Sequence, residues 1–404
     1  MLMTREPRTS PIVPSYGESS LADLSASILA SLTGDTAANV LGLPGAARVC
    51  LLIVDGLGWE LLRAHQAAAP FLSELAFNAR PLTAGFPSTT VTSLGSLGTG
   101  LPPGVHGMLG YQVAVPGTGR LLNALRWSSD VDPLAWQPKP TLFERAAAAG
   151  VVPVHVAPSA YANSGLTRAV MRGAHYRPAN SLGTLAAATV TALNDSERTL
   201  VAAYHGDLDS AGHEFGVSGP AWSFQLAYVD KLAEQIAGGL PLGTALYVTA
   251  DHGMVNVGPD DKVDVDLVPE LRNGVALLGG DPRARHVNAQ PGAAADVLAT
   301  WQKVLGERAW VMSRDEAIKD GWFGPVDPAM TARIGDVVAA AAGNTAIVAS
   351  KAEPKESALV GMHGSLTAAE QLVPMLAYAS RLTRASRPYW RDDRWHRRHP
   401  DHRG

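Results

Sequence analysis

RVCLLIVDG, residues 48–56, is a run of apolar, β-prone residues that ends directly in Asp55 and Gly56. An uninterrupted apolar run of this kind is typical of a strand that is covered on both faces. Three further runs have the same form: VVPVHV (151–156), TLVAAYHGD (199–207) and ALYVTADHG (245–253). Helical patterns alternate with these strands. We therefore predict an α/β fold with a mostly parallel central sheet.

The rest of the chain can be divided by its hydrophobic pattern and its Gly and Pro content. We expect helices within WELLRAHQAAAPFLSELAF (59–77), TLFERAAAAG (141–150) and AWSFQLAYVDKLAEQIAGG (221–239), and another core strand in NTAIVAS (344–350). A stretch punctuated by Gly and Pro between two core segments suggests an inserted cap subdomain. The expected organisation is a disordered N-terminal arm (1–20), a catalytic α/β core (21–256 and 341–380), the cap (257–340) and a basic, disordered tail (381–404).

Composition limits the classes of function. A formal net charge of -4 over 404 residues gives no broad basic surface, so nucleic acid is not an expected partner, except through the basic aromatic tail. Cys50 is the only cysteine, which excludes an intramolecular disulfide and a Cys-based zinc site. The first twenty residues have no apolar core of a signal peptide, and no later run reaches the length of a membrane span. We expect a cytoplasmic protein without a membrane partner.

Polar residues follow the predicted strands. In parallel sheets, ligands bind beyond the carboxyl ends of the strands. The side chains expected at that edge are Asp55, Asp207, Asp209, Asp251 and His252. Each is unremarkable alone, because an Asp-Gly after a strand is most often only a turn.

Histidines complete a candidate metal site. Asp209 and His213 are four residues apart, so one helical turn would place both side chains on one face. Gly212 would allow close approach, and His363 lies between two glycines in a loop. Mixed His and carboxylate ligands favour zinc over magnesium or calcium, and manganese is the alternative. We predict two divalent cations.

A hydroxyl-rich stretch supplies a candidate nucleophile. GFPSTTVTSLGSLGTGLPPGVHG (85–107) places Ser and Thr residues before a run of small residues that favours a tightly packed helix. A hydroxyl at a helix N-terminus lies where both an alkoxide and a phosphate are stabilised. Thr90 is the candidate; the alternative is that Ser88, Thr89 or Thr90 only caps the helix.

Together these segments resemble the nucleotide pyrophosphatase/phosphodiesterase family of the alkaline phosphatase superfamily. The resemblance runs from about residue 48 to residue 365 and is carried by LLIVDGLG, FPSTT with TGLPPGVHG, DLDSAGHEFG, ADHGM and GMHGS. It implies a three-layer α/β/α sandwich. It also implies that one zinc is held by Asp55, Thr90, Asp251 and His252, and the other by Asp209, His213 and His363.

The resemblance further implies hydrolysis through a phosphothreonine at Thr90, with the Val91 N–H donating to a phosphoryl oxygen. One position departs from the family pattern: Tyr111 stands where phosphodiesterases of this family usually place an Asn that binds the phosphoryl oxygen. Its phenol could still donate one hydrogen bond, so Tyr111 is a candidate catalytic residue; the alternative is packing.

Some candidates are weaker. Arg285 and His286 in ARHVN could reach a substrate anion, although ordinary surface positions are the simpler interpretation. Trp59, Trp127 and Trp222 could stack on a nucleobase, but aromatic residues in such patterns more often belong to the core.

The leading hypothesis is hydrolysis of phosphodiester or pyrophosphate bonds in a small, nucleotide-like substrate. A phosphomonoesterase or phosphonate hydrolase could use the same residues. A noncatalytic phosphate or nucleotide binder is the hypothesis from a different class, and the presence of Thr90 argues against it.

Overall fold

A computed structural model of the protein describes residues 10–380, and its centre is a six-stranded sheet. The strand order is β18-β8-β1-β7-β5-β6, and only β18 runs antiparallel to its neighbour. The bounds are β1 (Arg48–Val54), β5 (Val152–Ala157), β6 (His175–Pro178), β7 (Thr199–His205), β8 (Thr244–Thr249) and β18 (Met375–Ala379). Every residue of β7 is buried. The predicted parallel α/β sheet is therefore confirmed.

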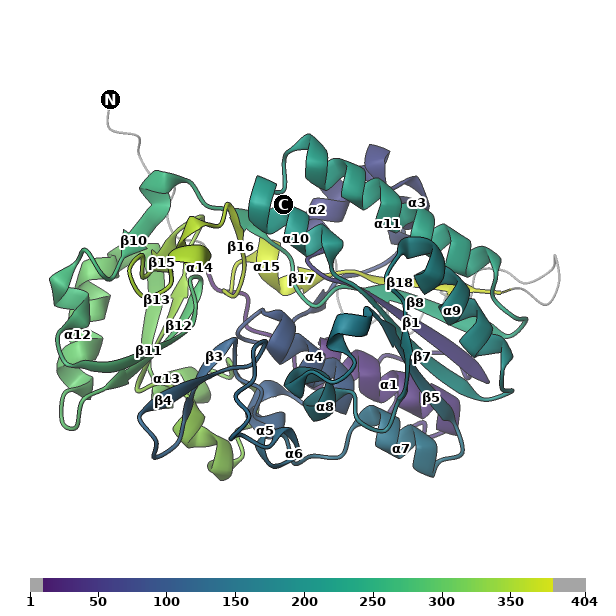
Figure 1. The fold of residues 1–404 in the computed structure, drawn as a ribbon, viewed down its shortest axis with the longest axis horizontal. Coiled ribbons are helices and arrows are strands. Elements are labelled where there is room, and N and C mark those ends of the chain that lie inside the picture. Colours follow the sequence, from purple (N-terminus) through teal and green to yellow (C-terminus); the bar gives the residue numbers. More distant parts are fainter. Residues whose placement is uncertain (1–9, 381–404) are drawn as a thin grey trace, which may run out of the picture.

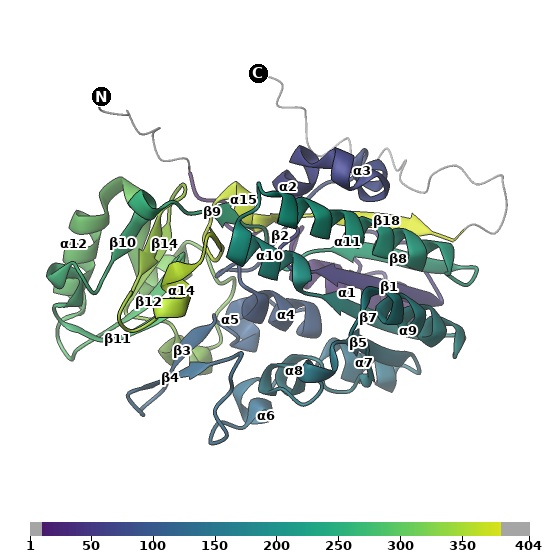
Figure 2. The ribbon, with the colours of Figure 1, turned by 45° about the horizontal axis from the view of Figure 1, so that its top comes forward.

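Helices cover both faces of this sheet (Figures 1 and 2). One face carries α2 (Trp59–Ala64), α3 (Pro70–Ala76), α9 (Leu182–Asn194) and α11 (Pro220–Gly238). The other carries α1 (Leu21–Thr33), α4 (Thr90–Thr99) and α7 (Leu142–Ala148), with the short helices α5 (Pro103–His106), α6 (Pro133–Trp136) and α8 (Gly165–Val170) beside α4. This is the three-layer sandwich that the family resemblance implied. Within residues 10–380, no helix combines the length and the apolar character that a membrane crossing requires.

A second lobe contains a four-stranded antiparallel sheet in the order β11-β12-β14-β13 (Figure 1). Its strands and the helices near it are β11 (Val275–Asp281), β12 (Ala284–Ala289), β13 (Ala309–Ser313), β14 (Val337–Ala341), α12 (Ala294–Leu305), α13 (Arg314–Lys319) and α14 (Pro354–Ala358). The lobe has its own apolar core around Trp301, which is fully buried. Most of it falls within residues 257–340, the stretch that we propose as an inserted cap.

Several short pairings join the two lobes and the connecting loops. Leu372–Val373 (β17) pairs with Leu82–Thr83 (β2), and Gly361–Met362 (β16) pairs with Val255–Asn256 (β9). The remaining elements are the hairpin β3 (Gln112–Val115) and β4 (Arg120–Asn123), the pair β10 (Lys262–Asp264) and β15 (Ala346–Val348), and the helices α10 (Asp207–Phe215) and α15 (Ala368–Gln371).

The stretch from 59 to 77 forms two helices, α2 and α3, because Pro70 lacks a backbone N–H and starts a new helix after a short 3₁₀ turn. Two expectations about the fold were wrong in detail. NTAIVAS forms β15, which pairs with β10 rather than joining the central sheet. Residues 10–20 do not form a disordered arm: Tyr16 donates a hydrogen bond to the Trp322 carbonyl (3.0 Å) and accepts one from the Phe86 N–H (3.1 Å). Residues 1–9 and the basic tail lie outside the described residues.

The small residues of α4 allow it to pack closely against α8. A Cβ atom on Gly98 would lie 2.1 Å from the Val170 carbonyl oxygen, whereas one on Gly183 in α9 would meet nothing within 4 Å. We therefore expect Gly98→Ala to lower the free energy of unfolding by about 1–3 kcal/mol, because the backbone of α8 must move. Gly183→Ala, the matched control, should be neutral or slightly stabilising. Urea unfolding of both variants checks this, and equal stability would contradict the close packing at Gly98.

Candidate dimetal site

The site lies where three neighbouring strands of the central sheet end. β8, β1 and β7 are adjacent and parallel, so their carboxyl ends meet at one edge. Asp55 follows β1, Asp251 and His252 follow β8, and α10 begins just after β7. Gly56 adopts a φ of 75°, which lets the chain turn sharply after Asp55. Of the side chains expected at this edge, Asp55, Asp209, Asp251 and His252 belong to the two groups of potential ligands described below, whereas Asp207 is exposed and belongs to neither.

The first group of potential ligands consists of Asp55, Asp251 and His252, whose ligand atoms all lie within 4.8 Å of one another. The His252 Nε2 atom lies 3.3 Å from Asp55 Oδ1 and 3.6 Å from Asp251 Oδ2. All three side chains are buried. The Thr90 hydroxyl lies beside this group, 3.3 Å from His252 Nε2 and 3.5 Å from Asp55 Oδ2.

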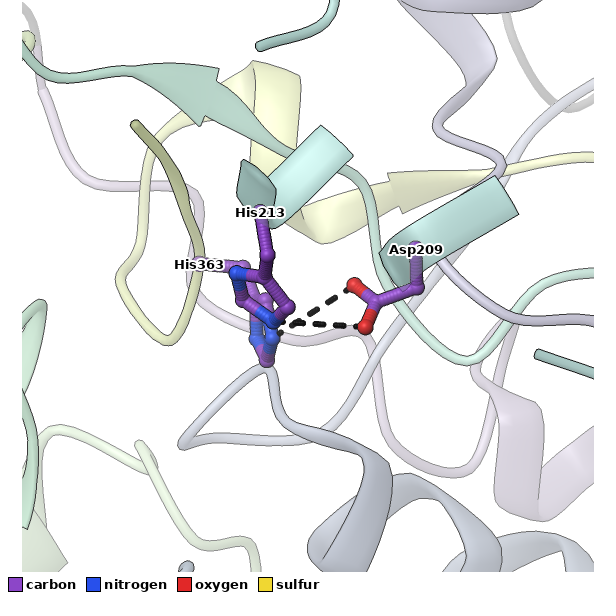
Figure 3. Close-up of side chains that lie close together, drawn as sticks. All are labelled: Asp209, His213 and His363. Carbon is purple, nitrogen blue, oxygen red and sulfur yellow. Dashed lines mark ion pairs between the residues drawn. The ribbon is translucent and has the colours of Figure 1, made fainter. Parts of the chain in front are cut away.

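The second group consists of Asp209, His213 and His363 (Figure 3). As the four-residue spacing predicted, Asp209 and His213 lie one turn apart on α10, with His213 Nε2 3.2 Å from Asp209 Oδ2. His363 approaches from the loop after β16, with its Nε2 3.8 Å from Asp209 Oδ1. Gly212 has a different role from the one expected, because a Cβ atom there would lie 2.4 Å from Met254 Sδ. A Cβ atom on Gly361 would lie 2.4 Å from the Gly212 carbonyl oxygen, so the missing side chain of Gly361 lets β16, just before the His363 loop, lie directly on α10.

The two groups are immediate neighbours. The imidazole rings of His252 and His363 stack with centroids 3.5 Å apart and planes 14° from parallel. The ring of His213 lies 5.1 Å from that of His363. A stack of this kind between one ring of each group places two potential cation positions side by side, as a two-ion mechanism requires.

Hydrogen bonds to the three histidines fit a role as metal ligands. Each ring has its Nδ1 atom beside a backbone carbonyl oxygen: Gly253 for His252 (2.9 Å), Gly361 for His213 (2.7 Å) and Ser88 for His363 (3.0 Å). A carbonyl oxygen can only accept, so Nδ1 carries the proton and the neutral ring presents the Nε2 lone pair to the site. Holding the tautomer in this way is what outer hydrogen bonds do for metal-bound histidines.

Each carboxylate of the two groups also has one oxygen that lacks a hydrogen-bonding partner. Asp55 Oδ1, Asp209 Oδ1 and Asp251 Oδ2 are buried without a hydrogen-bond partner. Unpartnered buried carboxylate oxygens facing imidazole lone pairs are costly unless a cation lies between them. The residues present therefore fit two divalent ions.

The close packing of carboxylates and imidazoles shifts the pKa values of several of these groups. Burial raises the pKa of Asp55 well above its usual range, and the Asp251 and Asp209 carboxylates raise it further. Burial and the His252 ring hold the pKa of His363 well below its usual value. For His213, burial lowers the pKa but the Asp209 carboxylate outweighs it, which leaves the value at about 9. Two bound cations would favour the ionised form of Asp55 and the neutral form of His213, because a metal ion binds carboxylates and imidazole lone pairs after their protons have left.

Thr90 is the first residue of α4, and its hydroxyl does not cap that helix. The capping position belongs to Thr89, whose side chain makes no capping bond, and the Ser88 hydroxyl donates to the Ser365 carbonyl (2.8 Å). Thr90 instead lines a cavity of about 400 Å³ together with Asp55, Asp209 and His363. The Val91 amide belongs to the first turn of α4, where backbone N–H groups have no acceptor within the helix.

Tyr111 lines the same cavity, but its hydroxyl donates to Glu356 Oε1 at 3.0 Å.

The structure contradicts the expectation that Arg285 and His286 reach a substrate. Arg285 is fully buried and bonds Glu353 (2.7 Å), while His286 is buried against the Leu109 carbonyl (2.9 Å). None of the three candidate tryptophans lines the cavity: Trp59 and Trp222 are buried in the core, and Trp127 is partly buried.

One residue of the site, Tyr204, has no distinguishing pattern in the sequence. The Tyr204 hydroxyl, buried at the end of β7, makes a short hydrogen bond to Asp55 Oδ2. In the sequence this tyrosine is simply one member of an apolar strand. Its hydrogen bond holds the same Asp55 oxygen that the Thr90 hydroxyl approaches at 3.5 Å.

Comparisons with known proteins agree with this geometry. Human ectonucleotide pyrophosphatase/phosphodiesterase 5 has a similar structure, at 20% identity and a TM-score of 0.66, over 82% of this chain and 88% of that one. So does phosphonoacetate hydrolase from Sinorhizobium meliloti 1021 in complex with phosphonoformate, at 21% identity and a TM-score of 0.66, over 86% and 93%. At such identities the likeness establishes the fold.

The inactive murine ectonucleotide pyrophosphatase/phosphodiesterase 5 in complex with AMP is similar to the same degree, with 18% identity, a TM-score of 0.66 and coverage of 82% and 88%. No curated protein matches the sequence at a significant level. Residues 49–366 match the family described as type I phosphodiesterase / nucleotide pyrophosphatase. The match covers most of the chain and includes every residue of both ligand groups. The chain therefore belongs to the type I phosphodiesterase / nucleotide pyrophosphatase family, within the alkaline phosphatase superfamily.

Proposed function

We propose that the protein hydrolyses phosphodiester or pyrophosphate bonds of small substrates, with Thr90 as its nucleophile. Asp55, Asp251 and His252, together with the Thr90 oxygen, would hold one divalent cation. Asp209, His213 and His363 would hold the other. The observation that carries the proposal is the position of the Thr90 hydroxyl, at a helix N-terminus and within 3.5 Å of both His252 and Asp55.

In this mechanism the Thr90 oxygen forms a bond to phosphorus while the bond to the leaving oxygen breaks, and the Thr90 proton passes to solvent. Water then forms a bond to phosphorus, the threonyl ester breaks and the hydroxyl is restored. Two bound cations would supply Lewis acidity, which stabilises the attacking and leaving oxygens. The Val91 N–H, at the positive end of α4, can donate to a phosphoryl oxygen. Tyr204 holds Asp55 in place.

The ligand set supports zinc as the resident metal. Three imidazoles and three carboxylates form a mixed set, which suits zinc better than the all-oxygen sites of magnesium or calcium, and manganese is the alternative. Activity restored to metal-free protein by zinc at equimolar concentrations, and less well by manganese, would support this assignment. Better restoration by manganese would reverse it.

The cavity walls favour diesters over more highly charged substrates. Within residues 10–380, the side chains that line the cavity include no Lys or Arg, so a second anionic group on the substrate would meet no basic side chain from this part of the chain. Phosphonate hydrolysis and monoester hydrolysis remain the second candidates, since the Sinorhizobium meliloti relative acts on phosphonoacetate and has a similar fold.

We expect kcat/KM for bis-nitrophenyl phosphate to exceed that for nitrophenyl phosphate by at least about tenfold, because the monoester carries an additional charge that the cavity does not neutralise. Steady-state assays of the two substrates on the same zinc-loaded protein check this. A preference for the monoester would make the protein a phosphatase. Full metal content with no turnover of either ester, nor of phosphonoacetate, would instead indicate a phosphate binder.

A further inference from the structure

The wall of the cavity that faces the second lobe is acidic. Asp281, the last residue of β11, and Glu356 of α14 both line the cavity, together with Tyr111. The wall formed by α4 and α8 is different, because it presents Leu94, Leu166, Val170 and other apolar side chains. The cavity therefore has one apolar and one negatively charged side.

Among residues 10–380, the basic groups near the acidic wall are fewer than its carboxylates. Arg285 interacts with Asp281, but this guanidinium is fully buried and already bonds Glu353. Glu356 accepts a hydrogen bond from the neutral Tyr111 phenol. Counting Asp281, Glu353 and Glu356 against Arg285 and against Arg126, which interacts with Tyr111, the wall carries an excess of negative charge when all five groups are ionised.

Asp281 itself has unused binding capacity. The residue is 8% exposed, and its Oδ2 atom is buried without a hydrogen-bond partner. A carboxylate held in this way gains stability when a cation approaches it.

The chemistry of the wall points to an organic cation rather than to another metal ion. Among residues 10–380, groups of three ligands that could hold a metal occur only in the dimetal site, and neither group includes Asp281 or Glu356. Carboxylates beside the ring of Tyr111 are instead the combination that recognises ammonium groups, through charge and through the π face of the aromatic ring. Asp281 also lies close enough to His213 for the two charges to interact, so this wall adjoins the reaction centre.

We propose that Asp281, Glu356 and Tyr111 form a subsite for an ammonium-bearing substituent of the phosphodiester substrate. This inference rests on the proposed function and makes it more specific: the preferred substrate is a zwitterionic diester, with one negative charge at phosphorus and one positive charge at this wall. The apolar wall would contact the other substituent.

The test compares two diesters that differ only in charge. Nitrophenyl phosphorylcholine carries a trimethylammonium group, and nitrophenyl 3,3-dimethylbutyl phosphate is its neutral isostere. We expect kcat/KM to be at least about tenfold higher for the cationic diester, the gain of a close and partly desolvated charge pair. The ratio should fall severalfold in Glu356→Gln and in Asp281→Asn, and it should be unchanged in Glu270→Gln, which alters an exposed carboxylate outside the cavity.

The ratio separates the two claims. Equal kcat/KM values for both diesters, or an unchanged ratio in Glu356→Gln, would overturn the subsite while leaving the diesterase intact. No hydrolysis of either diester by metal-loaded protein would overturn the proposed function itself. Glu356 is only partly buried, so its variant keeps the test decisive if Asp281→Asn fails to fold.

Discussion

Thr90→Val is expected to lower kcat/KM for a phosphodiester by at least about a thousandfold, because it removes the nucleophile but keeps the branched shape of the side chain. The cations should remain, since Asp55, Asp251 and His252 still provide three ligands. Steady-state kinetics and metal analysis by mass spectrometry on the same preparation measure both effects.

Thr92→Val is the matched control for this change. Thr92 is a buried residue of the same helix, it does not line the cavity, and its hydroxyl has no hydrogen-bond partner. Its loss should leave kcat/KM within about threefold of the starting value. If Thr90→Val lost its metals along with its activity, the main role of the Thr90 oxygen would be to hold the metal ion rather than to attack phosphorus. Unchanged activity in Thr90→Val would remove it from the mechanism.

Asp209→Ala and His363→Ala are expected to lower activity by at least about a hundredfold and to reduce the metal content from two ions to one. Asp209 faces both His213 and His363, so its loss leaves the second group without its only carboxylate. Loss of an outer hydrogen-bond partner alone costs about 10–100-fold in metal sites, and loss of a direct ligand should cost more. Metal analysis alongside diester kinetics checks the prediction.

Asp207→Asn provides the control, because Asp207 is an exposed carboxylate on the same helix and belongs to neither ligand group. Its metal content and activity should match those of the unaltered protein. Full activity in Asp209→Ala with one ion lost would show that a single cation suffices.

The sequence was informative wherever local patterns determine position. β1, β7 and β8 are continuous apolar runs, and parallel strands necessarily bring their following residues to one edge. Helical spacing likewise placed Asp209 and His213 on one face of α10. These two rules account for most of the proposed metal ligands.

Features that depend on tertiary packing had no such signal. Arg285 and His286 look like surface residues in the sequence, but β12 is an inner strand of its sheet, and their polar atoms bond Glu353 and the Leu109 carbonyl. The acidic wall joins Tyr111, Asp281 and Glu356, which are far apart in the chain. Tyr16 binds to groups about 70 and 306 residues away, which no local pattern indicates.

The most direct test of the account is the stereochemical course at phosphorus. A nitrophenyl phosphorothioate diester of one configuration would be hydrolysed in isotopically labelled water, and the configuration of the product determined. Two successive in-line displacements, first by Thr90 and then by water, retain the configuration, and this is the result that the account predicts. Inversion would show a single direct attack by water and would contradict the role of Thr90 as the nucleophile.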